Sequence, residues 1–282
     1  ASTLSGRYLA VEVFPLSFRE FLIFKRLHVK TKLDVVDQKI ELSRAFEEYR
    51  RFGAFPKVLA YQEEEKKELL TTYKDSILLK DIVARYQLKS VTTLEEISAF
   101  LLANSGIIQS TSKIKNSFKI SFDMARDYVE YLKNAYMIFE IKKFDYSLKK
   151  QNLNDRKYYS ADLGLSNLYR VANLKNRGND LETIVAIELQ RLGYEIYYYK
   201  TASNHEIDFV VSKDSAIVEL VQVSSSLEDE KTRKRELDVF AKTIKELSLG
   251  EVPCTVITEG KSASITHNEA KITVVNVLEW LV

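Results

Sequence analysis

The sequence predicts an α/β protein whose N-terminal half is helical and whose last part is a mixed sheet flanked by helices. Apolar residues recur at spacings of three and four over residues 28–90, as they do on one face of a helix. Residues 161–282 alternate helical and strand-like segments in the order α-β-β-β-α-β, which places helices on the faces of a sheet. Only 8 Gly and 3 Pro occur among 282 residues, which favours long helices over loops.

Composition narrows the classes of function. Lys and Arg number 42 against 40 Asp and Glu, so any basic surface must be local. The single cysteine, Cys254, excludes an internal disulfide and, with three scattered histidines, argues against a zinc site. No apolar run approaches the roughly 18 residues of a membrane span. We therefore expect a cytoplasmic protein with no membrane partner.

Residues 1–90 are expected to form a first part that is largely helical. Residues 8–14 are strand-like, Pro15 ends this strand, and Ser17 caps a following helix. Because an unpaired strand leaves an exposed edge, the pattern indicates a segment before residue 1. The charge run at residues 63–68 is interpreted as the solvated first turn of a helix.

Residues 91–160 are expected to form a winged helix-turn-helix. Thr92 or Thr93 caps a first helix, residues 110–119 form a second, and Ser121 caps a third that ends at residue 134. A strand at 137–141, a basic loop and a strand at 158–159 complete the wing. In such modules the third helix enters the major groove of DNA and the wing contacts the backbone.

The candidate nucleic-acid contacts are basic residues of the third helix and the wing. They are Arg126, Lys133, Lys142, Lys143, Lys149, Lys150, Arg156 and Lys157. The outward face of the third helix is mixed in sign, which argues against tight groove binding. The wing is the better electrostatic candidate, since its six basic residues face only Asp145 and Asp155. The alternative is that this small module only packs domains together.

Residues 161–282 are expected to form the last part. Its segments are a helix at 178–192, a strand at 194–199, a hairpin at 204–226, a helix at 228–247, strands at 252–258 and 272–275, and a short helix at 276–281. Side chains in a strand repeat with period two, so Glu206 and Asp208 project together on the first hairpin strand, as do Gln222 and Ser224 on the second. A carboxylate beside a polar pair can hold Mg²⁺ near a phosphate. The plainer alternative is a buried strand with two polar residues.

This frame resembles the PD-(D/E)XK nuclease superfamily, which has the restriction-endonuclease fold. The resemblance implies that Asp208 is the motif aspartate, that Gln222-Val223-Ser224 stands in place of Glu-X-Lys, and that Glu182 on the first helix completes the site. Asp208, Gln222 and Glu182 are then the catalytic candidates, and Asp208 and Glu182 the candidate magnesium ligands. Ser224 cannot supply the ammonium group that polarises the attacking water. Three lysines could replace it from another element: Lys200, Lys231 and Lys234.

A second resemblance covers the chain from Gly6 onward. Gly6-Arg7, residues 15–22, residues 42–60 with Gly53-Ala54-Phe55-Pro56, and residues 73–86 are similar to a family of prokaryotic AAA-type ATPases, in which a domain of uncharacterised function follows the ATPase core. Arg7 is then either a nucleotide-sensing arginine or an ordinary exposed one. The chain lacks the GxxxxGK[ST] pattern that cradles phosphates. ATP is therefore expected only if an upstream P-loop domain exists, and no cofactor is expected in this chain.

These patterns together predict the C-terminal, nucleic-acid-interacting region of an AAA-type ATPase with a degenerate, inactive nuclease-like domain. DNA is the expected partner, and no ATPase activity is expected from the chain alone. One alternative is a Mg²⁺-dependent DNA nuclease that uses Glu182, Asp208 and Gln222. A third is a protein-interaction module that supports AAA-type self-association or binds a partner ATPase.

Overall fold

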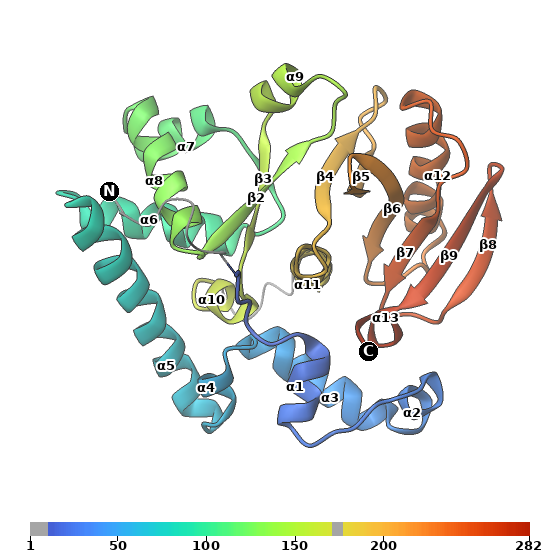
Figure 1. Ribbon diagram of the computed structural model, residues 1–282, viewed down its shortest axis with the longest axis horizontal. Coiled ribbons are helices and arrows are strands. Elements are labelled where there is room, and N and C mark those ends of the chain that lie inside the picture. The colour runs from blue at the N-terminus through green and yellow to red at the C-terminus, as the bar shows by residue number, and fades with distance from the viewer. Residues whose placement is uncertain (1–10, 171–176) are drawn as a thin grey trace.

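The computed structural model of the protein describes residues 11–170 and 177–282. In this part of the chain a helical N-terminal half is followed by a nine-stranded mixed sheet with helices among its strands (Figure 1). The α/β class expected from the sequence is confirmed. Within the same residues no helix has the length and apolar character needed to cross a bilayer.

The helices of the N-terminal half are α1 (Phe18–Phe24), α2 (Lys32–Asp37), α3 (Lys39–Phe52), α4 (Pro56–Leu59), α5 (Glu63–Ser76), the π-helix η1 (Ile77–Ala84), α6 (Val91–Ala103), α7 (Thr111–Phe118) and α8 (Phe122–Asn134). Later helices are α9 (Leu148–Leu153), α10 (Leu163–Asn167), α11 (Arg177–Arg191), α12 (Glu230–Glu246) and α13 (Val277–Leu281). The strands are β1 (Ile108–Gln109), β2 (Ile138–Lys143), β3 (Arg156–Ser160), β4 (Glu195–Lys200), β5 (Glu206–Lys213), β6 (Ala216–Ser224), β7 (Cys254–Thr258), β8 (Ala263–His267) and β9 (Ala270–Asn276).

The sheet is continuous across the middle of the chain. Its strand order is β1-β3-β2-β4-β5-β6-β7-β9-β8. The pairs β2–β4, β6–β7 and β7–β9 are parallel and the others antiparallel. Because β2 pairs with β4, the sheet crosses the expected boundary at residue 160. The division into 1–90, 91–160 and 161–282 stays a prediction about segments of the sequence.

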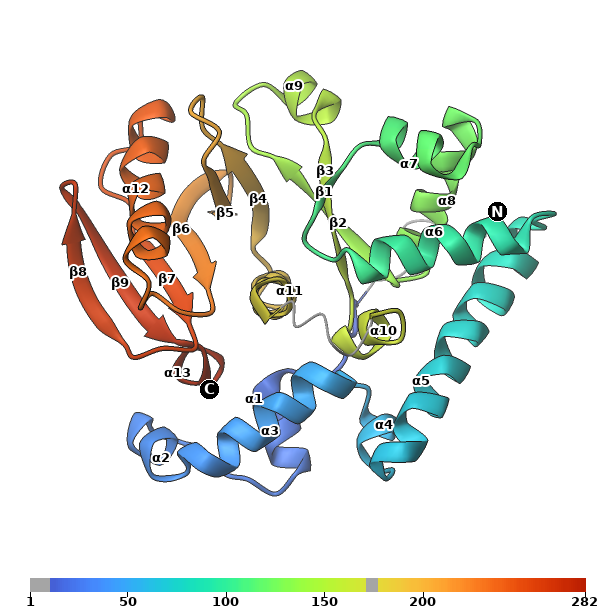
Figure 2. The same cartoon turned by 180° about the vertical axis from the view of Figure 1, so that it is seen from behind.

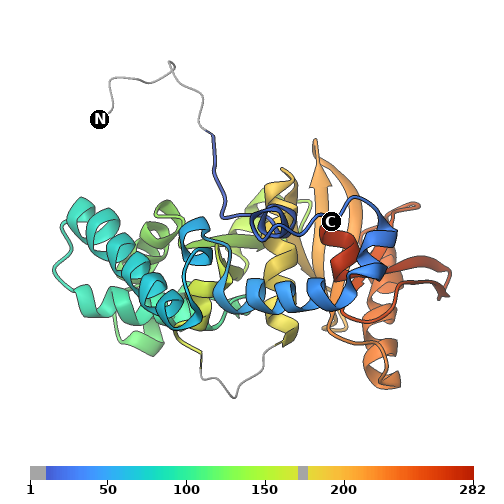
Figure 3. The ribbon, with the colours of Figure 1, turned by 90° about the horizontal axis from the view of Figure 1, so that it is seen from below.

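Helices cover both faces of the sheet where the strands are most buried. α11, with α1 and α3 beyond it, packs on one face through an apolar core that includes Phe18, Leu42 and Ile184. α12 lies on the other face, as the view from behind shows (Figure 2). Its Phe240 is part of the apolar core on that side of the sheet. Since both faces are covered, the interior residues of β5 are buried without alternation. α13 lies against α2 and α3, so the C-terminal helix meets the N-terminal helices (Figures 1 and 3).

Most predicted elements occur, with informative exceptions. Ser17 caps α1 in a capping box with Glu20, as expected. The strand expected at 8–14 is not formed in its described residues, 11–14, which have no neighbouring strand with which to pair. The residues before 11, including Gly6 and Arg7, lie outside the described part. The first helix of residues 91–160 begins one residue after Ser90 rather than after Thr92 or Thr93.

Three short elements had no clear sequence signal. α9 interrupts the loop between β2 and β3, and α10 follows β3. β8 pairs with β9 through a tight turn at Asn268 and Glu269, which have φ of 46° and 67°. A two-residue hairpin turn is usually predicted from an Asn-Gly pair, because both residues must adopt positive φ. Here Glu269 stands in place of the glycine, and glutamate rarely adopts positive φ, so the sequence did not indicate this hairpin.

Candidate functional site

The hairpin of β5 and β6 places Asp208 beside the Gln222-Val223-Ser224 segment. The two strands are antiparallel, with Phe209 opposite Val221, and a left-handed turn at Asp214 and Ser215 joins them. At Asp208 the regular ladder gives way to side-chain bonds. Asp208 N–H donates to Gln222 Oε1 at 3.1 Å, and Val223 N–H donates to Asp208 Oδ2 at 2.9 Å. The carboxylate therefore takes the place of a backbone acceptor at this point of the sheet.

A β-bulge explains how the Asp208 side chain is aimed. Between β4 and β5, Tyr197 pairs with Val210 but Tyr199 pairs with Ile207, so Asp208 and Phe209 together face the single residue between those tyrosines. Bulges bend a strand and redirect side chains, and they are common next to functional sites. Glu206 and Asp208 do project to the same side, as the period-two pattern predicts, but the bulge changes the direction of the Asp208 side chain in a way that the pattern does not predict.

Lys157, from β3, lies among three carboxylates. Its Nζ is 2.7 Å from Glu182 Oε1, 2.5 Å from Glu206 Oε1 and 3.7 Å from Asp208 Oδ1. Only 2% of the lysine is exposed. Glu182 comes from α11, and the other two carboxylates come from β5. The structure thus brings Glu182 and Asp208 together as expected, but around an ammonium group that was expected in the exposed wing.

Neighbouring groups hold this cluster in place and cover it. Tyr159 OH donates to Glu182 Oε1 at 2.6 Å. The loop after α6 packs over the same oxygen, since a Cβ placed on Gly106 would lie 3.5 Å from it. Gly106 adopts φ of 82°, and its N–H donates to the carbonyl of Tyr158 at 2.9 Å. The cluster is therefore buried between β3, α11 and β5.

The surroundings raise the pKa of both Asp208 and Lys157, but for different reasons. Burial raises the pKa of Asp208 well above its usual value, and the neighbouring Glu182 raises it further, while Lys157 opposes both effects. Burial alone would lower the pKa of Lys157, but the carboxylates of Glu182, Asp208 and Glu206, together with Tyr159, raise it well above its usual value. Lys157 is therefore charged at neutral pH, and Asp208 is biased toward its protonated form.

Gln222 and Ser224 take no part in the cluster around Lys157. Gln222 Nε2 donates to Glu236 Oε2 on α12 at 2.6 Å, and Arg235 lies 2.5 Å from the same carboxylate. Ser224 Oγ donates to the carbonyl of Ser226 at 2.9 Å. Gln222 therefore contacts the backbone of Asp208 and then extends to the opposite helix. Of the three residues expected to converge, Glu182 and Asp208 lie around Lys157 together with Glu206, whereas Gln222 lies against the backbone of Asp208.

The lysines considered as replacements for the missing motif lysine lie elsewhere. Lys231 and Lys234 are exposed on α12, and Lys200 pairs with Glu206 across the β4–β5 ladder. Lys157 is the lysine that reaches Asp208. Its sequence signal was the alternation in Arg156-Lys157-Tyr158-Tyr159, which puts Lys157 and Tyr159 on one face of a strand.

The carboxylates do not fit a magnesium ion as they stand. Across residues 11–170 and 177–282, no three His, Cys, Asp or Glu side chains are arranged to hold a metal. Magnesium requires near-octahedral oxygen ligands at about 2.0–2.1 Å and keeps several waters. Lys157 Nζ instead lies within hydrogen-bonding distance of Glu182 and Glu206, so the space among the carboxylates is filled.

Three of the other candidate nucleic-acid contacts are paired within the protein, either with carboxylates or with backbone carbonyls. Arg126 pairs with Asp123 and Asp127, and Lys133 pairs with Glu130 and Glu140. Arg156 donates to backbone carbonyls of the segment that contains α9.

Four lysines at the end of β2 and on α9 lack such strong partners. They are exposed or half-buried: Lys142, Lys143, Lys149 and Lys150. Lys142 Nζ donates to the neutral amide of Asn152 at 3.0 Å. Among the described residues the nearest carboxylate to any of the four is that of Asp145, at 4.0 Å from Lys150. The charge of this group, named here the four-lysine cluster, is therefore largely uncompensated.

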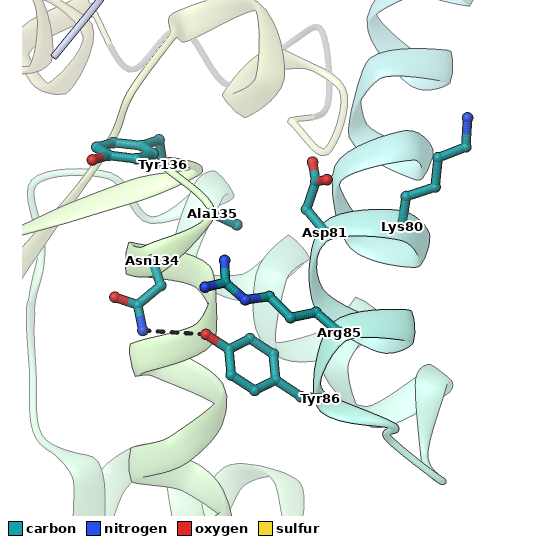
Figure 4. A pocket seen from close by; sticks show the side chains of 7 residues that line it. All are labelled: Lys80, Asp81, Arg85, Tyr86, Asn134, Ala135 and Tyr136. Atoms are coloured by element: carbon teal, nitrogen blue, oxygen red, sulfur yellow. Dashed lines mark hydrogen bonds between the residues drawn. The ribbon is translucent and has the colours of Figure 1, made fainter. Parts of the chain in front are cut away.

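Two hollows lie away from the carboxylate cluster. One, of about 270 Å³, lies between η1 and the end of α8, where Arg85 and Tyr86 face Asn134 (Figure 4). Asn134 Nδ2 donates to Tyr86 OH at 3.4 Å. The other, of about 630 Å³, lies beyond the ends of the parallel strands β6, β7 and β9. Both are lined by acidic and basic groups together, which favours no single class of ligand.

Two family models match adjoining regions of the chain, and the residues of the charged cluster are distributed over both regions. Residues 43–177 match the model of a domain of unknown function (DUF8612), and residues 177–279 match that of another domain of unknown function (DUF4143). Lys157 and Tyr159 belong to the first region, whereas the three carboxylates belong to the second. The charged cluster therefore joins the two regions.

Two relatives align over most of the chain. An uncharacterised protein of Methanocaldococcus jannaschii is 34% identical over 99% of this chain and 65% of its own length. An uncharacterised protein of Haemophilus influenzae is 34% identical over 79% of this chain and 55% of its own length. The chain thus spans less than two thirds of either relative, and no solved structure matches it. The protein carries a DUF8612 region followed by a DUF4143 region and is homologous to these two uncharacterised proteins.

Proposed function

We propose that this chain is a non-catalytic, nucleic-acid-interacting region with a winged helix followed by a restriction-endonuclease-like core. The element order α11-β4-β5-β6-α12-β7 supports the second assignment, as does the position of Asp208 opposite Gln222. The helices α6 to α8, followed by β2 and β3, support the first. The chain spans only part of its relatives, and we propose that an AAA-type ATPase core precedes it in the full protein.

One observation carries the binding proposal. After the internally paired cations are set aside, the four-lysine cluster remains at the end of β2 and on α9. It consists of Lys142, Lys143, Lys149 and Lys150. A local cluster of this kind attracts phosphates even though the chain as a whole is near neutral, at a formal charge of +2.

One observation supports the lack of catalysis. The Lys157 ammonium is buried among Glu182, Glu206 and Asp208, so these carboxylates are already compensated. The metal that would lower the pKa of an attacking water and neutralise a phosphate has no vacant set of oxygen ligands there.

The binding proposal is tested by fluorescence anisotropy with a labelled DNA duplex at 50 and 200 mM KCl. We expect weak binding that falls steeply with salt. Replacing the four lysines by Gln should reduce the log–log salt slope by roughly 3–4, because each phosphate that is no longer neutralised removes about 0.9 from the slope. The matched control replaces four exposed lysines elsewhere: Lys57, Lys67, Lys261 and Lys271. Equally weakened binding in both variants, or binding that ignores salt, would refute the proposal.

A Mg²⁺-dependent DNA nuclease is the second candidate. It is supported by the convergence of Glu182 and Asp208 on one ammonium group, since an amine and two carboxylates also occur together in metal-dependent nucleases. The test incubates single-stranded, linear and supercoiled DNA with the protein in Mg²⁺ or Mn²⁺. Cleavage that disappears in Asp208→Ala, with folding retained, would favour this candidate over the non-catalytic one.

A protein-interaction or oligomerisation module is the third candidate. Exposed apolar side chains flank the four-lysine cluster: Tyr146, Leu148 and Leu153 are 69%, 73% and 76% exposed. If the four-lysine variant binds duplex as well as the wild type, and the protein self-associates in sedimentation experiments, this function replaces DNA binding.

A further inference from the structure

We infer that Lys157 is a built-in replacement for a divalent cation: its ammonium holds Glu182, Glu206 and Asp208 together and so joins β3 to α11 and β5 without a metal ion. The inference does not depend on nucleic-acid binding by the four-lysine cluster. It concerns the carboxylate cluster alone and gives that cluster a structural role.

The stereochemistry of the ammonium group suits this role. Lysine carries three N–H donors and no acceptor. Glu182 and Glu206 lie within 2.7 Å of Lys157 Nζ, and Asp208 lies 3.7 Å away. These oxygens come from two elements that are separate in sequence, and a single positive group among them reduces their mutual repulsion. A bound metal cation would reduce the repulsion in the same way, so the ammonium group and a metal ion would occupy the same position.

The ammonium is held firmly in this position. β3 is fixed between β1 and β2, with Lys157 opposite Ile108 on one side and Ile141 on the other. The lysine is almost fully buried, and the ring of Tyr198 lies 5.9 Å from Nζ. A metal that entered the cluster would have to displace a charged group into its apolar surroundings, which is costly.

The balance of charge explains why a lysine is sufficient. Val223 N–H stabilises one Asp208 oxygen, and Tyr159 OH donates to Glu182. Burial and the neighbouring Glu182 raise the pKa of Asp208, so this carboxyl group adds less negative charge to the cluster than a solvated one would. The negative charge of the cluster is therefore smaller than three solvated acidic groups would carry, and one ammonium group with these hydrogen bonds compensates most of it. A divalent ion would in addition require displaced waters or new ligands.

The cluster also crosses the junction between the two matched sequence regions. Lys157 lies before residue 177, and Glu182, Glu206 and Asp208 lie after it. The backbone link between the regions in the sheet is short, since β2 and β4 share only two paired positions, Lys142–Tyr197 and Lys143–Tyr198. The buried cluster adds an ionic side-chain link next to this pairing.

The test measures Mn²⁺ binding by electron paramagnetic resonance and titration calorimetry on the full chain. Wild type is expected to bind no Mn²⁺ at the cluster up to millimolar concentration. Lys157→Met, which keeps an unbranched side chain but removes the ammonium group, is expected to gain one site at least tenfold tighter than any wild-type binding. That site should disappear again in Lys157→Met/Glu182→Gln.

The control is Lys66→Met, since Lys66 is another buried lysine that pairs with a carboxylate, Glu48, at 2.5 Å. It should gain no Mn²⁺ site. If Lys157→Met does not fold, the same comparison is made in Lys157→Met/Glu206→Gln, which removes one negative charge along with the positive one. A folded charge-removed variant that binds no Mn²⁺ overturns the inference.

Wild-type Mn²⁺ binding that disappears in Asp208→Asn also overturns it, and it does so independently of DNA. The DNA titration with the four-lysine variant reports on the proposed function, so the two results can fail separately. Wild-type Mn²⁺ binding through Asp208 would refute the role of Lys157 as the resident cation but leave nucleic-acid binding untouched.

Discussion

Removing the charge of Lys157 should cost much more stability than removing that of another buried lysine. Breaking a buried ion pair by deleting one partner costs about 3–5 kcal/mol, because the remaining charge is left uncompensated. Lys157→Met leaves Glu182, Glu206 and Asp208 facing one another, so we expect a decrease of this size in the free energy of unfolding at pH 7. Urea unfolding followed by circular dichroism measures it.

Lys66→Met supplies the comparison. Its partner Glu48 keeps Lys25 at 2.7 Å and is 26% exposed in its side chain, so the carboxylate remains compensated and partly hydrated. We expect a decrease of roughly 1 kcal/mol or less for this variant. Equal decreases for Lys66→Met and Lys157→Met would show that the lysine among the carboxylates has no special role.

The pH dependence of the variant provides a second check. Without Lys157 the carboxylates repel one another, which raises their pKa values in the folded state above those in the unfolded state. The folded state then binds more protons, so the variant's free energy of unfolding should fall as pH rises from 5 to 8. The deficit relative to wild type should accordingly be smaller at pH 5. A deficit that is unchanged or larger at pH 5 would contradict the electrostatic explanation.

Three further predictions concern the packing around the cluster and the N-terminal helices. Gly53→Ala should unfold or strongly destabilise the protein in thermal melts, since its φ is 71° and a Cβ there would overlap the carboxylate of Asp162; Gly250→Ala, with open space around it, should change little. Burial raises the pKa of Asp162 to about 6, so the free energy of unfolding should fall by roughly 2 kcal/mol as pH rises from 4 to 6. Asp162→Asn should abolish that slope in urea titrations, and an unchanged slope would refute the assignment. Tyr159→Phe should cost about 1.5–3 kcal/mol in urea unfolding because the hydrogen bond to Glu182 is removed, and a neutral result would show that the bond contributes little.

The motif Gly53-Ala54-Phe55-Pro56 has a physical explanation in its contacts. Ala54 N–H donates to Asp162 Oδ2 at 2.7 Å, and Gly164 N–H donates to Asp162 Oδ1 at 2.8 Å. Asp162 caps α10 and connects it to the end of α3. The glycine is required because only a residue without Cβ fits against the aspartate in this left-handed conformation.

Local sequence patterns were sufficient to predict the positions of most helices and strands in the C-terminal part. The positions of β4, β5, β6, α12 and β7 follow from runs of apolar residues, a polar turn and the acidic start of a helix, which are all properties of neighbours in sequence. The opposition of Asp208 and Gln222 depends on the turn and on a β-bulge, since the register of β5 and β6 shifts by one residue between Val211 and Ser212.

The partner of Asp208 did not follow from local pattern. In the sequence, α10 lies between Lys157 and Glu182, and α10, α11 and β4 lie between Lys157 and the carboxylates of β5. The strand of Lys157 reaches them only because β2 pairs with β4 in parallel. Basic residues in a loop are usually solvated, so burial of one member of a basic run cannot be inferred from composition. The β-bulge at Asp208 is likewise set by pairing with β4 and has no signature of its own.

The sequence by itself determined the α/β class, the order of the elements and the presence of an acidic residue next to Gln222-Val223-Ser224, because periodicity and turn chemistry act over a few residues. Tertiary structure alone decided which charge compensates that acid. The answer depends on strand order, and strand order brings Lys157 of β3 to Glu182 of α11 and to Glu206 and Asp208 of β5. Electrostatic interactions act through space, so the contact that defines this site is made by residues that no local motif joins.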